Sequence, residues 1–228
     1  MQNSEILKKV KELREITGVG FKDCKLAIDE CNGDIDLSID YLRKKGISKA
    51  NKKMERVAAE GLVAIKEENN KISIVEINCE TDFVAKNAEF MKFLEEISKI
   101  TLKNKGNLKL IENENIFGEK KVKDYLIDLI AKIGEKITIR RSMFFDNKDS
   151  YNFYYIHNQT TQSIGKIGVI VNIKSSIKKD ELLEMGKKIA MHIAAMNPLS
   201  INLEDFDKKI VDNENKIIKE ELKNSGKD

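Results

Sequence analysis

The sequence predicts an α+β protein with a small helical module at its N-terminus. Short amphipathic segments fill residues 1–46, and runs rich in β-branched residues begin at Gly61. Longer segments of helical spacing lie between these runs, without the regular strand–helix–strand repeat that would predict a parallel sheet. We therefore expect a core of antiparallel sheet with helices, followed by a C-terminal helix.

The N-terminal segment carries the spacing of three short helices. Behind a cap at Asn3 or Ser4, apolar residues recur at three- and four-residue intervals. A TGVG turn and an NGD turn separate the next two helices, and the third is expected to end at Gly46. The apolar positions are Ile6, Val10, Leu13, Ala27, Ile28, Cys31, Ile35, Ile39 and Leu42. Because such a small bundle is marginally stable alone, residues 1–46 are predicted to be a tethered docking module.

A linker and a first core subdomain are predicted next. Residues 47–56 are expected to be a basic linker, because the run KKGISKANKKMER that starts at Lys44 has no apolar face. Residues 57–142 form the first core subdomain, which opens with the hairpin pattern of GLVAI and KISIVEINC. The further elements expected are helices over 87–102 and 119–133 and a strand over 136–145.

A second core subdomain is predicted over residues 143–202. YNFYYIHN and KIGVIVNIK have the composition of a strand pair, and a segment of helical spacing over 180–198 stops at Pro198. Residues 203–228 are highly charged with loosely spaced apolar residues, which predicts a long exposed helix.

Composition limits the functional classes. With 41 Lys and Arg against 38 Asp and Glu, the net charge is only +3, which does not indicate a protein that coats nucleic acid. The three cysteines are an odd number, and Cys24 and Cys31 lie about 10 Å apart along a helix, too far for a disulfide. No apolar run approaches the roughly 20 residues that span a bilayer. We expect a soluble protein of a reducing intracellular compartment that does not bind membranes.

Enzymatic chemistry has weak support. Cys79 could act as a nucleophile with His157 or His192 as base, but it lies in an apolar strand, where a small buried thiol is the ordinary interpretation. The sequence has no complete phosphate-binding loop and none of the close Cys and His pairs of zinc sites. We therefore predict no catalytic residue, no metal, no cofactor and no direct nucleotide binding.

The stretch VEINCETDFVAKN raises the question of where Phe83 lies. If one helix runs from Thr81 or Asp82 to residue 100, Phe83 and Phe90 share a face and both belong to the core, which spacing alone favours. If Asn87 instead ends a short first turn, the segment TDF lies on a strand-to-helix corner that projects outward.

The residues also carry a resemblance to a known family. The segments LREITGVGFKDCKLAIDECNGDIDLSIDYLRKKG, VAAEGLVAI, VEINCETDFVAKN, AKIGEKITIRR, YYIHN with GKIGVIV, and IAMHIAAMNP occur in the family's order over nearly the whole chain. The chain resembles the translation elongation factor Ts family, the guanine-nucleotide exchange factors of elongation factor Tu. The resemblance implies a ubiquitin-associated-like N-terminal module, an antiparallel core and no covalent chemistry.

The resemblance also implies two sets of partner-binding residues. Asp82 and Phe83, flanked by Thr81 and Val84, would disturb the magnesium and phosphate site of elongation factor Tu so that GDP is released, and His157 would lie at the interface nearby. Docking to the GTPase domain would use Arg14, Phe21, Lys22, Lys25 and Lys53. Lys22 replaces the second residue of an apolar pair frequent in the family, and His192 fits a packed helix as well as a contact.

Other expectations concern context. Family members usually continue past EELKNSGKD into a helical hairpin, so the sequence predicts a truncated or a naturally short chain. A bacterial cytoplasm, or an organelle matrix if a targeting segment is missing, is the expected location, and a homodimer is compatible with the sequence.

Two further alternatives are an interaction scaffold without exchange activity and RNA binding through the basic linker. The linker has no interleaved aromatic residues to stack bases, so no specific nucleic-acid binding is expected.

Overall fold

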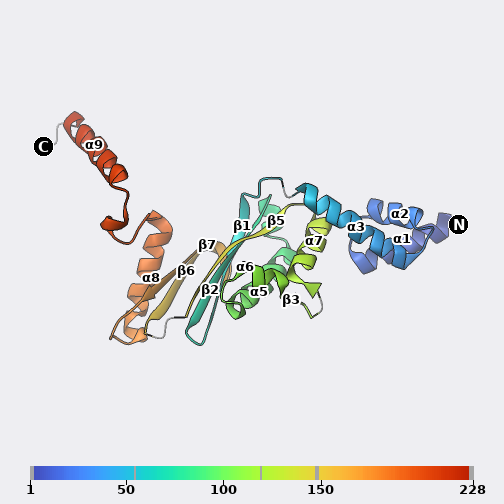
Figure 1. The fold of residues 1–228 in the computed structure, drawn as a ribbon, viewed down its shortest axis with the longest axis horizontal. Coiled ribbons are helices and arrows are strands. Elements are labelled where there is room, and N and C mark those ends of the chain that lie inside the picture. The colour runs from blue at the N-terminus through green and yellow to red at the C-terminus, as the bar shows by residue number, and fades with distance from the viewer. Residues whose placement is uncertain (1–2, 54, 119, 147–148, 226–228) are drawn as a thin grey trace.

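A computed structural model describes residues 3–53, 55–118, 120–146 and 149–225, and it confirms the α+β class. The N-terminal helices lie at one end of an elongated molecule, the sheet and its helices form the middle, and the C-terminal helix lies at the other end (Figure 1). The remaining residues, which belong to the predicted module, linker, core and tail, lie outside the described part.

The N-terminal module consists of α1 (Asn3–Thr17), α2 (Phe21–Glu30) and α3 (Ile35–Lys53), as predicted from the apolar spacing. Its small core contains Val10, Leu13, Cys24, Ala27, Ile28 and Leu42. The buried Cys24 thiol donates a hydrogen bond to the Val19 carbonyl at 3.3 Å, which fixes the turn between α1 and α2. The apolar core and this hydrogen-bonded turn hold the three helices together.

The predicted end of the third helix at Gly46 is wrong. α3 continues to Lys53, so residues 47–53 of the predicted linker are helical. Gly46 lies where α3 packs on α7 (Val122–Ile133), and a Cβ atom on it would approach the Ala131 Cβ to 3.2 Å. The glycine therefore permits a close helix crossing, and the contact with α7 stabilises a segment without an apolar face of its own.

The central sheet has five antiparallel strands in the order β5–β2–β1–β7–β6. The hairpin of β1 (Glu60–Glu68) and β2 (Lys71–Cys79) is paired from end to end, and β5 (Ile137–Phe145) extends it along β2. β6 (Tyr151–Thr161) and β7 (Ile164–Ile173) form the second hairpin. The two hairpins are joined where β1 pairs with β7, at Val63–Gly165 and Ala64–Ile164, and the Ile65 amide donates to the Ser163 carbonyl at 2.9 Å. Division of the core after residue 142 stays a prediction, and β5 itself extends to Phe145.

The larger core lies between the first hairpin and the helices packed on one of its faces. α5 (Ala88–Lys103) contributes Phe90, Phe93, Leu94 and Ile97, all fully buried, and α7 adds Leu129 and Ile130. Between them lie α6 (Leu108–Asn113), β3 (Asn115–Ile116) and β4 (Lys120–Lys121). The helix predicted from residue 119 begins at Val122, because the backbone of Lys120–Lys121 pairs with β3.

The second hairpin is covered by α8 (Lys179–Met196), which packs on both β6 and β7. Gly186 of α8 sits directly on the Phe153 ring of β6, so a Cβ atom there would lie only 2.2 Å from the ring. The helix ends in a left-handed residue, Asn197, immediately before Pro198, where the sequence predicted a stop. This glycine contact sets how closely α8 approaches the sheet.

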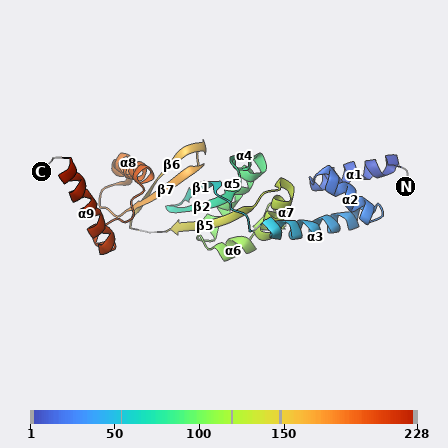
Figure 2. The ribbon, with the colours of Figure 1, turned by 90° about the horizontal axis from the view of Figure 1, so that it is seen from above.

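The C-terminal segment contains a 3-10 turn (Leu203–Asp205) and α9 (Lys208–Asn224). α9 has no buried residue, which confirms the predicted exposed helix, and it extends from the body in Figures 1 and 2. Over the part of the chain that the structure describes, every helix is too short or too polar to cross a membrane.

Gly186→Ala should lower the free energy of unfolding by about 2 kcal/mol, because the added methyl group overlaps the Phe153 ring. The sign of this change in the free energy of unfolding is informative, because a glycine-to-alanine substitution within a helix otherwise stabilises a protein by about 1 kcal/mol. Urea denaturation followed by circular dichroism measures the change. Lys188→Ala on the exposed side of α8 is the control and should stay within about 0.5 kcal/mol of the parent. Stabilisation by Gly186→Ala would show that the helix is not seated on Phe153.

Candidate functional site

The chain turns sharply between β2 and α5, and we refer to residues 80–87 as the corner. α4 (Asp82–Ala85) is a single helical turn, and the Oγ1 of Thr81 caps it by accepting from the Val84 amide at 3.4 Å. Asn87 has extended backbone angles and caps α5, with its Oδ1 accepting from the Glu89 amide at 2.8 Å. The helix therefore stops and restarts within the corner, as the second interpretation of VEINCETDFVAKN required.

Phe83 projects from this corner into solvent. Its side chain is 80% exposed, whereas Phe90 on α5 is fully buried. The two rings do not share a helical face, so the interpretation of Phe83 as a core residue is wrong. Val84 and Ala85, the next two residues, are 7% and 2% exposed and belong to the larger core. The corner is thus anchored by small apolar side chains while it presents an aromatic ring to solvent. In Figure 2, α4 lies at the margin of the body.

Two carboxylates hold the corner against the start of β5. The Glu135 carboxylate accepts from the Thr81 amide at 3.0 Å and from the Thr81 hydroxyl at 2.8 Å. In the reverse direction, the Glu80 carboxylate accepts from the Lys136 amide at 2.6 Å. That backbone hydrogen bond, with the nearby Arg56 guanidinium, lowers the pKa of Glu80. The two reciprocal contacts fix the direction in which α4 leaves the sheet.

Asp82 lies on the exposed side of α4 and forms an ion pair with Lys86 at 2.8 Å. The hydrogen bond from Lys86 lowers the pKa of Asp82, and the charge of Lys166 on β7 contributes in the same direction. Lys166 also forms an ion pair with Glu60 on β1. Asp82 is therefore ionised at neutral pH, and it lies at the edge of a cluster of alternating charges.

The two histidines occupy different settings. His157 is exposed on β6, its Nδ1 lies 3.1 Å from the Tyr155 hydroxyl, and it pairs across the hairpin with Ile167, next to Lys166. The contact of His157 with Tyr155 lies within its own strand, away from the corner in sequence. His192 is exposed on α8, so it is not the packed histidine that the apolar helix suggested as one alternative.

The predicted docking residues lie on the N-terminal module and at its junction with the core. Arg14, Phe21, Lys22 and Lys25 are all exposed on α1 and α2, outside the small core. Lys53 differs from them, because its ammonium group donates a hydrogen bond to the Gly134 carbonyl, just before Glu135. The structure thus brings the end of α3 to the same α7–β5 connection that holds the corner.

Thiol chemistry at Cys79 is disfavoured by its surroundings. Burial raises the pKa of Cys79 to about 11, with the charges of Glu135 and Glu60 adding to the effect. The thiol donates to the Thr81 carbonyl at 3.2 Å, so it serves the corner as a hydrogen-bond donor. Within the described residues, no group of three or more His, Cys, Asp or Glu side chains is placed to hold a metal ion.

Comparisons with known proteins agree with this arrangement. The family model described as "Elongation factor TS" matches residues 80–228. The chain is 44% identical to elongation factor Ts of Methylobacterium sp. (strain 4-46) over 219 residues, covering 96% of this chain and 71% of that protein. The chain belongs to the elongation factor Ts family. It is also 42% identical to the elongation factor Ts proteins of Parvibaculum lavamentivorans and Maricaulis maris, again with 96% and 71% coverage. A role in translation elongation follows from this membership.

For this member of the elongation factor Ts family, sequence reasoning missed the charged residues that hold or surround the corner. Glu80, Glu135, Glu60 and Lys166 had no assigned role, although Glu80 stands next to the TDF segment. Their partners lie more than 50 residues away or on another strand. The local signal in the sequence was the position of Glu80 beside the TDF segment, whereas Gly134 marks the end of α7 without indicating what Glu135 binds.

Glu135→Gln should loosen the corner without unfolding the protein, because each Thr81 donor uses a different carboxylate oxygen and one of these oxygens becomes an NH₂ group, which cannot accept. Hydrogen exchange of the Thr81 to Ala85 amides is expected to accelerate about tenfold, which corresponds to the loss of one hydrogen bond to a charged group. Amide exchange followed by NMR measures this change. Glu112→Gln on exposed α6 is the control and should leave these amides unchanged. Equal rates in the parent and Glu135→Gln would contradict the clamp.

Cys79 should react slowly with a thiol reagent at neutral pH, because it is fully buried and its raised pKa keeps it protonated. Cys31, which is partly exposed, should react first, and Cys24 and Cys79 should react only after denaturant is added. Mass spectrometry after timed labelling gives the order. Rapid labelling of Cys79 in the native protein would revive the thiol-enzyme alternative.

Proposed function

We propose that this protein binds elongation factor Tu in its GDP-bound form and promotes release of GDP and its exchange for GTP. The corner acts on the partner through Asp82 and Phe83, and Thr81 and Val84 hold these two residues in place. Phe83 inserts near the magnesium and phosphate site of the GTPase, and Asp82 places a negative charge beside it. When the surroundings of the magnesium ion are disturbed, the GTPase binds its nucleotide less tightly. No covalent step is involved.

The observation that carries the proposal is the exposure of Phe83 on a held corner. An aromatic side chain that is 80% exposed contributes little to the stability of its own protein. Two carboxylate contacts and two buried side chains nevertheless fix the backbone that carries this ring. A rigid, exposed aromatic residue is typical of an interface anchor, because little conformational entropy is lost when it binds.

The free energy that one buried phenylalanine can contribute is comparable with the coupling that nucleotide exchange requires. A GDP held with a nanomolar dissociation constant is bound by about 12 kcal/mol, and a thousandfold faster release requires about 4 kcal/mol of coupling. Burial of one phenylalanine contributes about 1.5 to 3 kcal/mol, and truncation of a hot-spot aromatic costs about 2 to 4 kcal/mol. Phe83 supplies much of the coupling, so the affinity for the partner must come from other surfaces.

The N-terminal module supplies that affinity in this proposal. Arg14, Phe21, Lys22 and Lys25 offer three cations and an aromatic ring on an exposed helical surface. Lys53 links α3 to the connection that carries Glu135 and thereby sets the position of the module relative to the corner. Two sites joined in one chain bind with a raised effective concentration, so the second contact follows readily from the first. His157 on β6 completes the partner surface.

The relatives named above are bacterial proteins, which supports the bacterial cytoplasm as the place of action. The nucleotide is bound by the partner and not by this chain. Exchange needs one copy of the corner per GTPase, so a homodimer is compatible with the mechanism but is not required by it.

Phe83→Ala should lower the stimulated rate of GDP release from elongation factor Tu by at least about tenfold, which is a cost of about 1.4 kcal/mol to the coupling. Stopped-flow release of a fluorescent GDP analogue measures the rate. Because the ring is exposed, the free energy of unfolding should change by less than about 0.5 kcal/mol.

Leu110→Ala is the matched control for Phe83→Ala, since it removes a 54% exposed apolar side chain from α6 and should leave the release rate unchanged. If the parent chain itself leaves GDP release unstimulated, the scaffold alternative holds. If Phe83→Ala exchanges as fast as the parent, the corner is not the means of action.

A further inference from the structure

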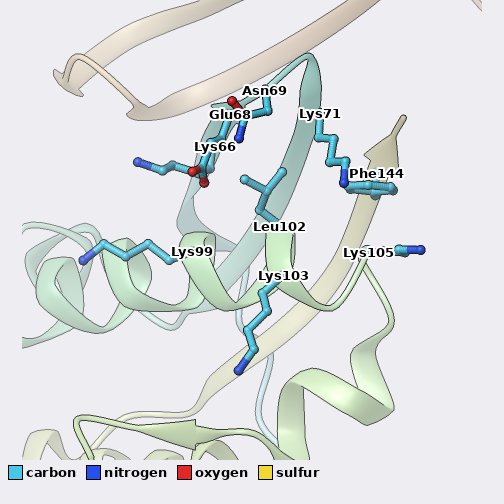
Figure 3. Close-up of a pocket in the computed structure, with 9 residues that line it drawn as sticks. All are labelled: Lys66, Glu68, Asn69, Lys71, Lys99, Leu102, Lys103, Lys105 and Phe144. Atoms are coloured by element: carbon cyan, nitrogen blue, oxygen red, sulfur yellow. The ribbon is translucent and has the colours of Figure 1, made fainter. Parts of the chain in front are cut away.

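A pocket lined by lysines lies at the end of the first hairpin that is remote from the corner, and we refer to it as the lysine pocket. Its volume is about 540 Å³, and β1, β2, the last turns of α5 and the loop after α5 bring five lysines to it (Figure 3). Phe144 of β5 forms part of the wall, and Glu68 is the acidic residue among the lining side chains. The lysines are Lys66, Lys71, Lys99, Lys103 and Lys105.

The positive charge of the lysine pocket is only partly neutralised. Lys99 pairs with Glu96 at 2.9 Å and Lys103 with Glu114 at 3.1 Å, and both lysine side chains are at least half exposed. Exposed ion pairs of this kind contribute little to stability, so these lysines can exchange their partners for a bound anion. The side chains of Lys66 and Lys105 form no hydrogen bond or ion pair with the described residues, whereas the Lys71 ammonium lies 3.8 Å from the Asp146 carboxylate. The five lysines therefore outnumber the acidic side chains that line the pocket or pair with them, and their ammonium groups extend in different directions around it (Figure 3).

The character of the lining favours an extended polyanion over a small ion. α5 presents its C-terminal end to the pocket, and the partial negative charge of that end disfavours a compact anion held close to the helix. Lysine ammonium groups are strongly hydrated point charges on flexible stems, which suits contact with successive phosphates along a backbone. The ring of Phe144, which is half-buried, offers a surface on which an unpaired base can stack.

We propose that the lysine pocket binds the phosphate backbone of single-stranded RNA without sequence preference, with Phe144 stacking against a base. This site differs from the basic linker considered in the sequence. β1 pairs with β2 from Glu60–Cys79 to Glu68–Lys71, so the pocket lies about 26 Å from the corner along the strands. RNA binding here is therefore independent of the exchange activity proposed above.

Binding of a fluorescein-labelled uridine oligonucleotide of about 12 nucleotides, followed by anisotropy between about 50 and 200 mM KCl, tests the proposal. The variant combines Lys66→Gln, Lys103→Gln and Lys105→Gln. It should bind about tenfold more weakly, and the slope of log affinity against log salt should fall by about 2, at roughly 0.7 per lost phosphate contact. Phe144→Leu should weaken binding and leave the slope unchanged, because it removes stacking and no charge.

The matched control combines Lys216→Gln, Lys219→Gln and Lys223→Gln on exposed α9, which removes the same charge from a distant surface. It should bind RNA like the parent chain. Equal weakening of both triple variants would overturn the proposal in favour of diffuse attraction, and so would a parent chain that fails to bind at about 50 mM KCl. Competition by inorganic phosphate at constant ionic strength would also overturn it, by showing a small-anion site. Thermal melting and GDP release by the lysine variant check that its fold and exchange activity are intact.

Discussion

The bidentate contact between Glu135 and Thr81 is the interaction on which the proposed action of this protein depends. An exposed phenylalanine can act on a partner only if its backbone is fixed, and a single helical turn such as α4 is too short to be stable alone. Glu135 accepts from both the amide and the hydroxyl of Thr81, so it fixes the residue that begins and caps the turn. Val84 and Ala85 fix its other end through burial. Phe83 lies between these two anchors and has almost no contacts of its own.

The same constraint links the corner to the rest of the chain. Glu135 follows α7, which packs against α3, and Lys53 at the end of α3 donates to the carbonyl of Gly134. The N-terminal module and the corner are therefore attached to one short connection. A molecule built in this way can dock through its helices and present its aromatic ring at a fixed distance from them. The second hairpin and α8 join the first hairpin through two β1–β7 residue pairs and a shared apolar cluster, and also through two ion pairs. The cluster contains Ile65, Ile72 and Ile156, and the ion pairs are Glu60–Lys166 and Glu67–Lys179.

Local pattern and tertiary contact account for different parts of this structure. The α+β class, the two hairpins and the exposed α9 could be predicted, because alternation and helical spacing reflect local burial. The spacing of Phe83 and Phe90 favoured a shared helical face, and the Asn87 cap overrode it. Gly46 had the character of a helix end, yet it allows α3 to pack on Ala131. The roles of Glu135 and Lys166 could not be predicted because their partners lie far away in sequence, and the lysine pocket is assembled from three separate stretches of the chain, 66–71, 99–105 and Phe144.

The most direct test of the central claim uses the absence of tryptophan from this sequence. With Phe83→Trp labelled as 5-fluorotryptophan, the protein gives one ¹⁹F NMR signal, and the shift between H₂O and D₂O reports how exposed the ring is. We expect a large solvent isotope shift in the free protein, and its loss on addition of GDP-bound elongation factor Tu. A ring already shielded in the free protein, or a signal that the partner leaves unchanged, would contradict it.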